Sequence, residues 1–180
     1  MLTGTHVTLR PIREADLKLL YDVHIDLPNR GDYFPLQLVS ETQFIKDFRD
    51  TGFLTPERGT LLIIDRDDRI VGRVQYYPTV SYLGELELGY HIFDRTQRGK
   101  GIASEAVQLL ARYLFDTRPV NRLRLIIHTD NAASRRLAEK CSFRHEGTSR
   151  GAWFHGGRFQ DVEVYALLRE EAASLASGRG

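Results

Sequence analysis

Cysteine is almost absent from this 180-residue sequence, which has a single one at Cys141. One cysteine excludes an intrachain disulfide and every metal site that is built from several cysteines, so we expect Cys141 to be a buried packing residue. The six histidines show neither His-x-x-x-His spacing nor a neighbouring carboxylate at metal-ligand spacing. We therefore expect no metal site.

The chain also lacks a strong charge of one sign and long hydrophobic runs. Its 25 basic and 24 acidic residues give a net charge of +1, which leaves no electrostatic footprint for nucleic acid or an anionic membrane. The apolar runs are far shorter than the roughly 20 residues that cross a bilayer, and the first residues do not resemble a signal peptide. We expect a cytoplasmic protein without a nucleic-acid or membrane partner. The sequence does not decide the oligomeric state, and a homodimer stays open.

What the chain has is enough apolar material for one core, since 42% of its residues are hydrophobic and 27% are charged. We expect one domain over residues 1–170 and a frayed C-terminal tail over residues 171–180. Hydrophobic periodicity predicts helices at 13–24, 40–52, 99–115 and 131–140, and strands at 5–10, 60–65, 70–77, 85–93, 123–129, 143–148 and 159–168.

A glycine-spaced loop joins the strand at 85–93 to the helix that follows it. Gly99 and Gly101 let the backbone approach an anion closely, and the first amides of the helix point at that anion with the positive end of the dipole behind them. Arg98 and Lys100 add positive charge. The loop is not a dinucleotide fingerprint, because Ser104 stands where the third glycine belongs. The pattern predicts a phosphate cradle of another kind.

The segment Arg98-Gly99-Lys100-Gly101-Ile102-Ala103 resembles Arg/Gln-x-x-Gly-x-Gly/Ala, the pyrophosphate loop of the GNAT N-acetyltransferase superfamily. Glu87-Leu88-Gly89-Tyr90 and Asn131-Ala132-Ala133-Ser134 are similar to the branch that contains the ribosomal-protein N-terminal acetyltransferases. The resemblance implies an α+β GNAT fold, a mixed and mostly antiparallel central sheet of about seven strands with helices on both faces. It also implies acetyl-coenzyme A (acetyl-CoA) as cosubstrate.

In this superfamily the cofactor lies along a splayed strand and the glycine loop. The resemblance implies that the amides of Tyr90, Ile92 and Phe93 pair with the pantetheine arm and polarise the thioester carbonyl. The other residues that the resemblance places on the cofactor are Arg98, Gly99, Lys100, Gly101, Ile102, Ala103, Asn131 and Ser134.

The reaction that the resemblance implies is acetylation of a primary amine, and its main obstacle is a proton. An alkyl amine is about 0.1% neutral at pH 7, so presenting the nucleophile costs roughly 4 kcal/mol unless a base or a dry pocket offsets it. Glu87 is our candidate for that task, directly or through a water. The alternation of residues 85–92 fits equally well with a strand whose polar face, including Glu87 and His91, is wetted.

The departing thiolate needs a hydrogen-bond donor. Many GNAT enzymes use a tyrosine at the position that is Ala138 here, so the resemblance to the ribosomal-protein branch implies Ser134 instead. The alternative is that Ser134 and Asn131 satisfy backbone amides at the start of their helix.

We expect acceptor choice to depend on two turn-rich segments, residues 27–35 and 150–158. Arg30, Tyr33, Phe34 and Trp153, with Glu87, are the predicted substrate-binding residues, and Asp32, Arg150 and Arg158 suit an amine with polar or anionic groups. The same aromatics fit equally well as core residues.

Three functions stay open. We favour acetylation of a small metabolite or an antibiotic-like amine over acetylation of a protein N-terminus, such as that of a ribosomal protein. The third is a non-catalytic module that binds acyl-CoA as a sensor.

Overall fold

The computed structural model describes residues 1–80 and 82–172. Residues 173–180 of the predicted tail lie outside the described residues. None of the helices within the described ranges combines the length and the apolar composition that a bilayer crossing requires.

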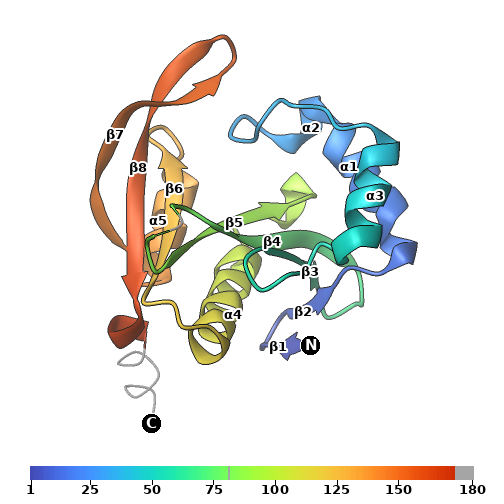
Figure 1. Ribbon diagram of the computed structural model, residues 1–180, viewed down its shortest axis with the longest axis horizontal. Helices are drawn as coiled ribbons and strands as arrows, with labels where there is room; N and C mark the ends of the chain where they lie inside the picture. The colour runs from blue at the N-terminus through green and yellow to red at the C-terminus, as the bar shows by residue number, and fades with distance from the viewer. Residues whose placement is uncertain (81, 173–180) are drawn as a thin grey trace.

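An eight-stranded sheet in the order β1-β2-β3-β4-β5-β6-β8-β7 forms the centre of the structure (Figure 1). Only β5 and β6 are parallel, and the other neighbours are antiparallel. The eighth strand is β1, which precedes the predicted strand at 5–10; a turn, in which the Gly4 amide donates to the Val7 carbonyl, separates it from β2. The strands are β1 (Leu2–Thr3), β2 (Thr8–Pro11), β3 (Gly59–Ile64), β4 (Ile70–Pro78), β5 (Glu85–Ile92), β6 (Arg122–His128), β7 (Arg144–His155) and β8 (Arg158–Leu168).

The helices follow their predicted caps closely. The side chain of Ser40 accepts a hydrogen bond from the Gln43 amide, and Gly52 ends the same helix in the left-handed conformation. One short helix, with Pro28 in its first turn, lies within a segment that the sequence predicts as a loop. The elements are η1 (Glu14–Asp16), α1 (Leu17–Ile25), α2 (Leu27–Arg30), α3 (Glu41–Thr51), η2 (Arg95–Gln97), α4 (Ile102–Thr117) and α5 (Ala132–Lys140).

Strand β3 explains why the sheet has helices on both faces. Leu61 and Ile63 belong to a core cluster with α4 and α5, whereas Leu62 and Ile64 belong to a second cluster with α1 and α3. Alternate residues of one strand therefore enter two cores, which makes the strand apolar throughout. Each such buried side chain stabilises the fold by about 1.5–3 kcal/mol.

The functional feature of the sheet is the separation of β5 from β6. A parallel pair needs a crossover, which α4 supplies. The two strands are in register only from Glu85–Arg122 to Glu87–Arg124, although β5 continues to Ile92 and β6 to His128. Beyond Glu87 a wedge therefore opens between them.

The hairpin of β7 and β8 differs from its prediction. Residues 150–155, expected in a loop, continue β7, and the turn is confined to Gly156 and Gly157, which both have positive φ. A register shift between Ser149 and Trp153 bends β7, and there the Gly151 amide donates to a carboxylate oxygen of Asp161. In Figure 1 the hairpin extends beyond the sheet on the side of α2.

Candidate active site

A cleft of about 1500 Å³ occupies the wedge between β5 and β6 and continues over the sheet toward α2 and α3. Two of the predicted site residues, Phe93 and Lys100, do not line it: the Phe93 amide donates to the Val71 carbonyl of β4, and Lys100 donates to the Gln97 side chain. The predicted residues that do line it are Arg30, Tyr33, Phe34, Glu87, Tyr90, Ile92, Arg98, Gly99, Gly101, Ile102, Ala103, Asn131, Ser134 and Trp153.

The bond of Phe93 to β4 fixes where the other amides of β5 point. Successive amides of a strand point to opposite edges, so the amide of His91 shares the β4 edge with that of Phe93. The amides of Tyr90 and Ile92 consequently face the wedge. These two can pair with an extended ligand, as the sequence predicts, whereas the Phe93 amide is engaged.

The glycine loop has the backbone that an anion cradle requires. Gly99 and Gly101 have φ of 77° and 84°, a left-handed conformation that strains other residues. Gly101 caps α4, whose first amides open into the cleft. The Lys140 ammonium lies 3.8 Å from where a Cβ on Gly101 would be. Sequence reasoning missed this cation, because it comes from the end of α5.

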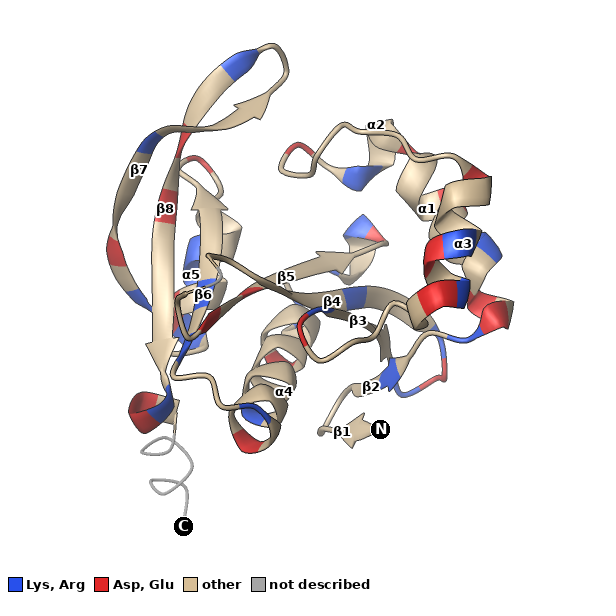
Figure 2. Ribbon diagram, viewed as in Figure 1, with Lys and Arg blue, Asp and Glu red and all other residues tan. Residues whose placement is uncertain are grey.

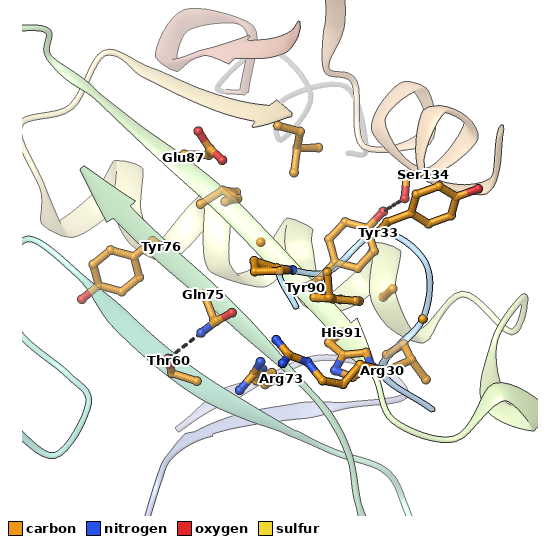
Figure 3. Close-up of a pocket in the computed structure, with 18 of the residues that line it drawn as sticks. Arg30, Tyr33, Thr60, Arg73, Gln75, Tyr76, Glu87, Tyr90, His91 and Ser134 are labelled. Carbon is orange, nitrogen blue, oxygen red and sulfur yellow. Dashed lines mark hydrogen bonds between the residues drawn. The ribbon is translucent and has the colours of Figure 1, made fainter. Parts of the chain in front are cut away.

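The sequence left open whether Asn131 and Ser134 cap their helix or present a hydroxyl to the ligand, and in the structure each residue does something different. The Asn131 side chain accepts from the Ser134 amide at 3.1 Å and so caps α5. The Ser134 hydroxyl is instead a partner of the Tyr90 hydroxyl, which donates to it at 2.7 Å (Figure 3). Burial raises the pKa of Tyr90 to about 12, so this tyrosine stays protonated. The Ser134 proton is left available for a third group.

Glu87 is a firmly held carboxylate. One oxygen accepts from the Tyr77 hydroxyl at 2.7 Å and the other from Arg124 at 3.0 Å. The side chain is only 14% exposed, so the wetted-strand alternative does not describe it. Burial and the neighbouring Glu87 raise the pKa of Tyr77, which remains a donor. Both contacts hold the Glu87 carboxylate in a fixed position in the lining of the cleft.

Aromatic rings line the other part of the cleft. Tyr33 and Trp153 both pack on the ring of His128, at centroid distances of 5.2 and 5.3 Å. Phe34 packs on His91 at 4.3 Å. Segments more than a hundred residues apart thus meet here, as the sequence predicts for residues 27–35 and 150–158.

The charged residues of those two segments separate. Asp32 lines the cleft, whereas Arg150 and Arg158 are exposed and lie outside it. Arg30 is 5% exposed and donates to the carbonyls of His24 and Gln37, so it also holds its own loop together. Among the described residues there is no group of three or more side chains that could hold a metal ion.

Comparison with known proteins places this architecture. The model of the acetyltransferase (GNAT) domain family matches residues 6–144. The probable N-acetyltransferase YjcK of Bacillus subtilis is 31% identical over 95% of this chain and 98% of its own length. The ribosomal-protein-serine acetyltransferase of Escherichia coli is 25% identical over 89% of this chain and 91% of its own. Other relatives, 30–34% identical, match over 62–64% of their own length.

Among solved structures, the spermidine N-acetyltransferase of Vibrio cholerae in complex with CoA and spermine superimposes with a TM-score of 0.82. The match covers 94% of this chain and 99% of that one, at 19% sequence identity. At this identity the likeness shows the fold, a mixed and mostly antiparallel sheet with helices on both faces.

Proposed function

Since the chain belongs to the GNAT acetyltransferase family, we propose that it transfers the acetyl group of acetyl-CoA to the primary amine of a small molecule. The observation that carries the proposal is one continuous cleft whose lining includes the left-handed glycines Gly99 and Gly101, the Ser134 hydroxyl and the Glu87 carboxylate. We name residues 99–103 with Ser134 the cofactor end, and Arg30, Arg73, His91 and Trp153 the acceptor end.

The cofactor end fits a pyrophosphate and a pantetheine arm. The left-handed glycines and the start of α4 offer backbone donors to phosphate, and Lys140 adds a positive charge. The amides of Tyr90 and Ile92 face the wedge and would hold the arm. When bound, acetyl-CoA supplies a thioester, which the amine nitrogen attacks to form an amide and release the thiol.

Ser134 is the proposed donor to the departing sulfur. Because its oxygen already accepts from Tyr90, its own proton is free to point at the sulfur. A thiol with a pKa near 8.5 is a tolerable leaving group, so this hydrogen bond suffices without full proton transfer. Tyr90 acts through Ser134 and is a positioning residue.

Glu87 is the proposed partner of the amine. Its negative charge attracts the ammonium form, and a proton from the amine passes to it directly or through a water. Glu87→Gln should lower the rate most at neutral pH, with partial recovery as rising pH deprotonates the amine in solution. Glu85→Gln is the matched control, because Glu85 also pairs with Arg124 but does not line the cleft. Equal pH profiles for Glu87→Gln and the wild type would remove this role.

The test of the function is thiol release from acetyl-CoA in the presence of an amine panel. The panel contains small metabolites, aminoglycosides, spermidine and a peptide with a free N-terminal serine. Release with small amines supports the proposal, and release with the peptide alone supports a protein N-terminus. Binding of acetyl-CoA in calorimetry without release for any amine supports the sensor instead.

A further inference from the structure

The acceptor end contains positive side chains that the protein does not neutralise. Arg30 lies in α2 and Arg73 in β4, and the charges of both act on His91, as does the charge of Arg98, which is exposed and donates to the Ile92 carbonyl (Figure 2 shows the basic segments in blue). Figure 3 shows the guanidinium groups of Arg30 and Arg73 side by side next to His91, with Glu87 at the far end of the strand. The described residues form no ion pair with any of the three arginines.

The unsatisfied polar atoms of the protein gather in the same place. Of the seven buried side-chain nitrogens without a hydrogen-bond partner among the described residues, six line this cleft. They are the Nε atoms of Arg30 and Arg73, both ring nitrogens of His91, Nε2 of His128 and Nε1 of Trp153. Arginine and tryptophan nitrogens are donors only, so what is missing is a set of acceptors.

Other partly buried arginines of this chain form ion pairs with carboxylates. Arg10 pairs with Asp16, and Arg122 and Arg124 pair with Glu85 and Glu87. Burial lowers the pKa of Arg73 to about 10, a sign that its charge is costly where it lies. Arg30 is buried and Arg73 is half-buried, so holding these two positive charges together without a counter-charge lowers the stability of the fold.

We propose that Arg30 and Arg73 form a subsite for an anionic group, a carboxylate or a phosphate, carried by the acceptor amine. This rests on the proposed function and names the chemical class of its acceptor. Guanidinium groups bind carboxylate and phosphate through paired, charge-assisted hydrogen bonds, and Trp153 supplies a further donor. A polyamine such as spermidine carries the opposite charge, and this end of the cleft repels it.

The register of the sheet sets the size of the acceptor. Arg73 lies opposite His91 and Tyr77 lies opposite Glu87, so all four side chains share one face of the sheet. His91 and Glu87 are four residues apart along β5, about 13 Å in an extended strand. An acceptor with several bonds between its amine and its anionic group spans from Glu87 to the arginines.

The decisive experiment compares acceptors that differ only in this group. The probes are ω-amino carboxylates of two to five methylenes, their carboxamides, aminoalkyl phosphates and α,ω-diamines, each assayed by thiol release. We expect kcat/KM at least about tenfold higher for the carboxylate or the phosphate than for the carboxamide. Higher activity on the phosphates than on the carboxylates identifies the anion. Equal or better use of the carboxamide or the diamine overturns the inference while the acetyltransferase function stands.

Variants test whether the preference for anionic acceptors depends on Arg73. Arg73→Gln should abolish the preference for the anion, and Arg73→Lys should retain part of it. Arg58→Gln is the matched control, because Arg58 also lines the cleft but is exposed and precedes β3. A preference that survives Arg73→Gln refutes the assignment, and the comparison of probes on the wild type needs no variant to fold.

A binding readout separates this inference from the proposed function. Trp153 is the only tryptophan of the chain, so titration with glutarate or inorganic phosphate at constant ionic strength can be followed by its fluorescence. We expect saturation for the wild type and none for Arg73→Gln. If no amine releases thiol but this result is obtained, the proposed function fails and the anion subsite stands. If amines react but neither anion binds, the subsite fails.

Discussion

The two ends of the cleft are built from different materials. The cofactor end consists mainly of backbone, with two left-handed glycines, the first amides of α4 and the amides of Tyr90 and Ile92. The acceptor end consists of side chains from α2, β4, β5 and β7. Backbone donors fit any CoA thioester, whereas side chains change from one sequence to another and set which acceptor fits. One protein thus combines a generic end with a specific one.

Ser134 is the exception at the cofactor end, since it is a side chain for which we propose a chemical role. Ser134→Ala should lower kcat about a hundredfold, as loss of a donor to a leaving group does, with little change in acceptor KM. Tyr90→Phe should lower kcat less, because Ser134 keeps its own proton. Steady-state kinetics with both substrates varied measures this. An unchanged kcat for Ser134→Ala would show that the cofactor end uses backbone alone.

His91 carries a pH dependence that is specific to the acceptor end. Burial, together with the charges of Arg73, Arg98 and Arg30, lowers its pKa to about 3. Between pH 7 and pH 5 the unfolded chain protonates this histidine and the native state does not, so stability falls by about 2 kcal/mol.

His91→Asn and His91→Phe should remove that part of the slope, measured by urea unfolding at each pH. Half-buried His24 and buried His128, whose pKa values burial also lowers, keep the remainder of the slope. A slope equal to that of the wild type in both variants contradicts the environment described for His91.

Gly101→Val tests the backbone character of the cofactor end. A β-branched residue at φ of 84° distorts the loop, and we expect a more than tenfold loss of CoA affinity in calorimetry. Gly52→Val is the matched control, because Gly52 is also left-handed with no atoms near its Cβ position but ends α3. If both variants lose stability but bind CoA normally, the cradle is not where we place it.

Trp153→Ala and Tyr33→Ala give the smallest expected effects and sharpen the division of the cleft. Each removes a ring that packs on His128, so acceptor KM should rise severalfold while the CoA dissociation constant stays within about twofold. The measurement requires an acceptor that the amine panel has first identified. Equal losses for both ligands in folded variants would mean that the two ends are not independent.

The cofactor end was easier to predict from the sequence than the acceptor end, because local patterns encode it. The glycine loop, the cap of α3 and the strand alternation are local patterns, and the structure has them where they were expected. The aromatic segments were recognised because turn-rich stretches with rings are unusual. The extension of β7 through residues 150–155 was missed, because a strand bent by a register shift loses its strict alternation.

Contacts between segments that are far apart in the sequence leave no local sequence pattern, so individual side-chain contacts of this kind were not predicted. Tyr90 and Ser134 are 44 residues apart, and the sequence suggested only the backbone of Tyr90. Arg73 was not among the predicted site residues, because nothing local in the strand at 70–77 shows that Arg30 lies near it. His91 was expected on the same face as Glu87, which is correct, but it is 3% exposed because Phe34 covers it.

The short paired segment between β5 and β6 has a consequence for the local motions of the protein. It divides the sheet into a five-stranded part and a three-stranded part, joined by three residue pairs and by α4. In the free protein the amides of Tyr90 and Ile92 belong to a strand edge, where hydrogen exchanges with solvent through small local openings. A ligand seated in the wedge takes the place of the missing ladder, so the cosubstrate also acts as a cross-brace between the two parts.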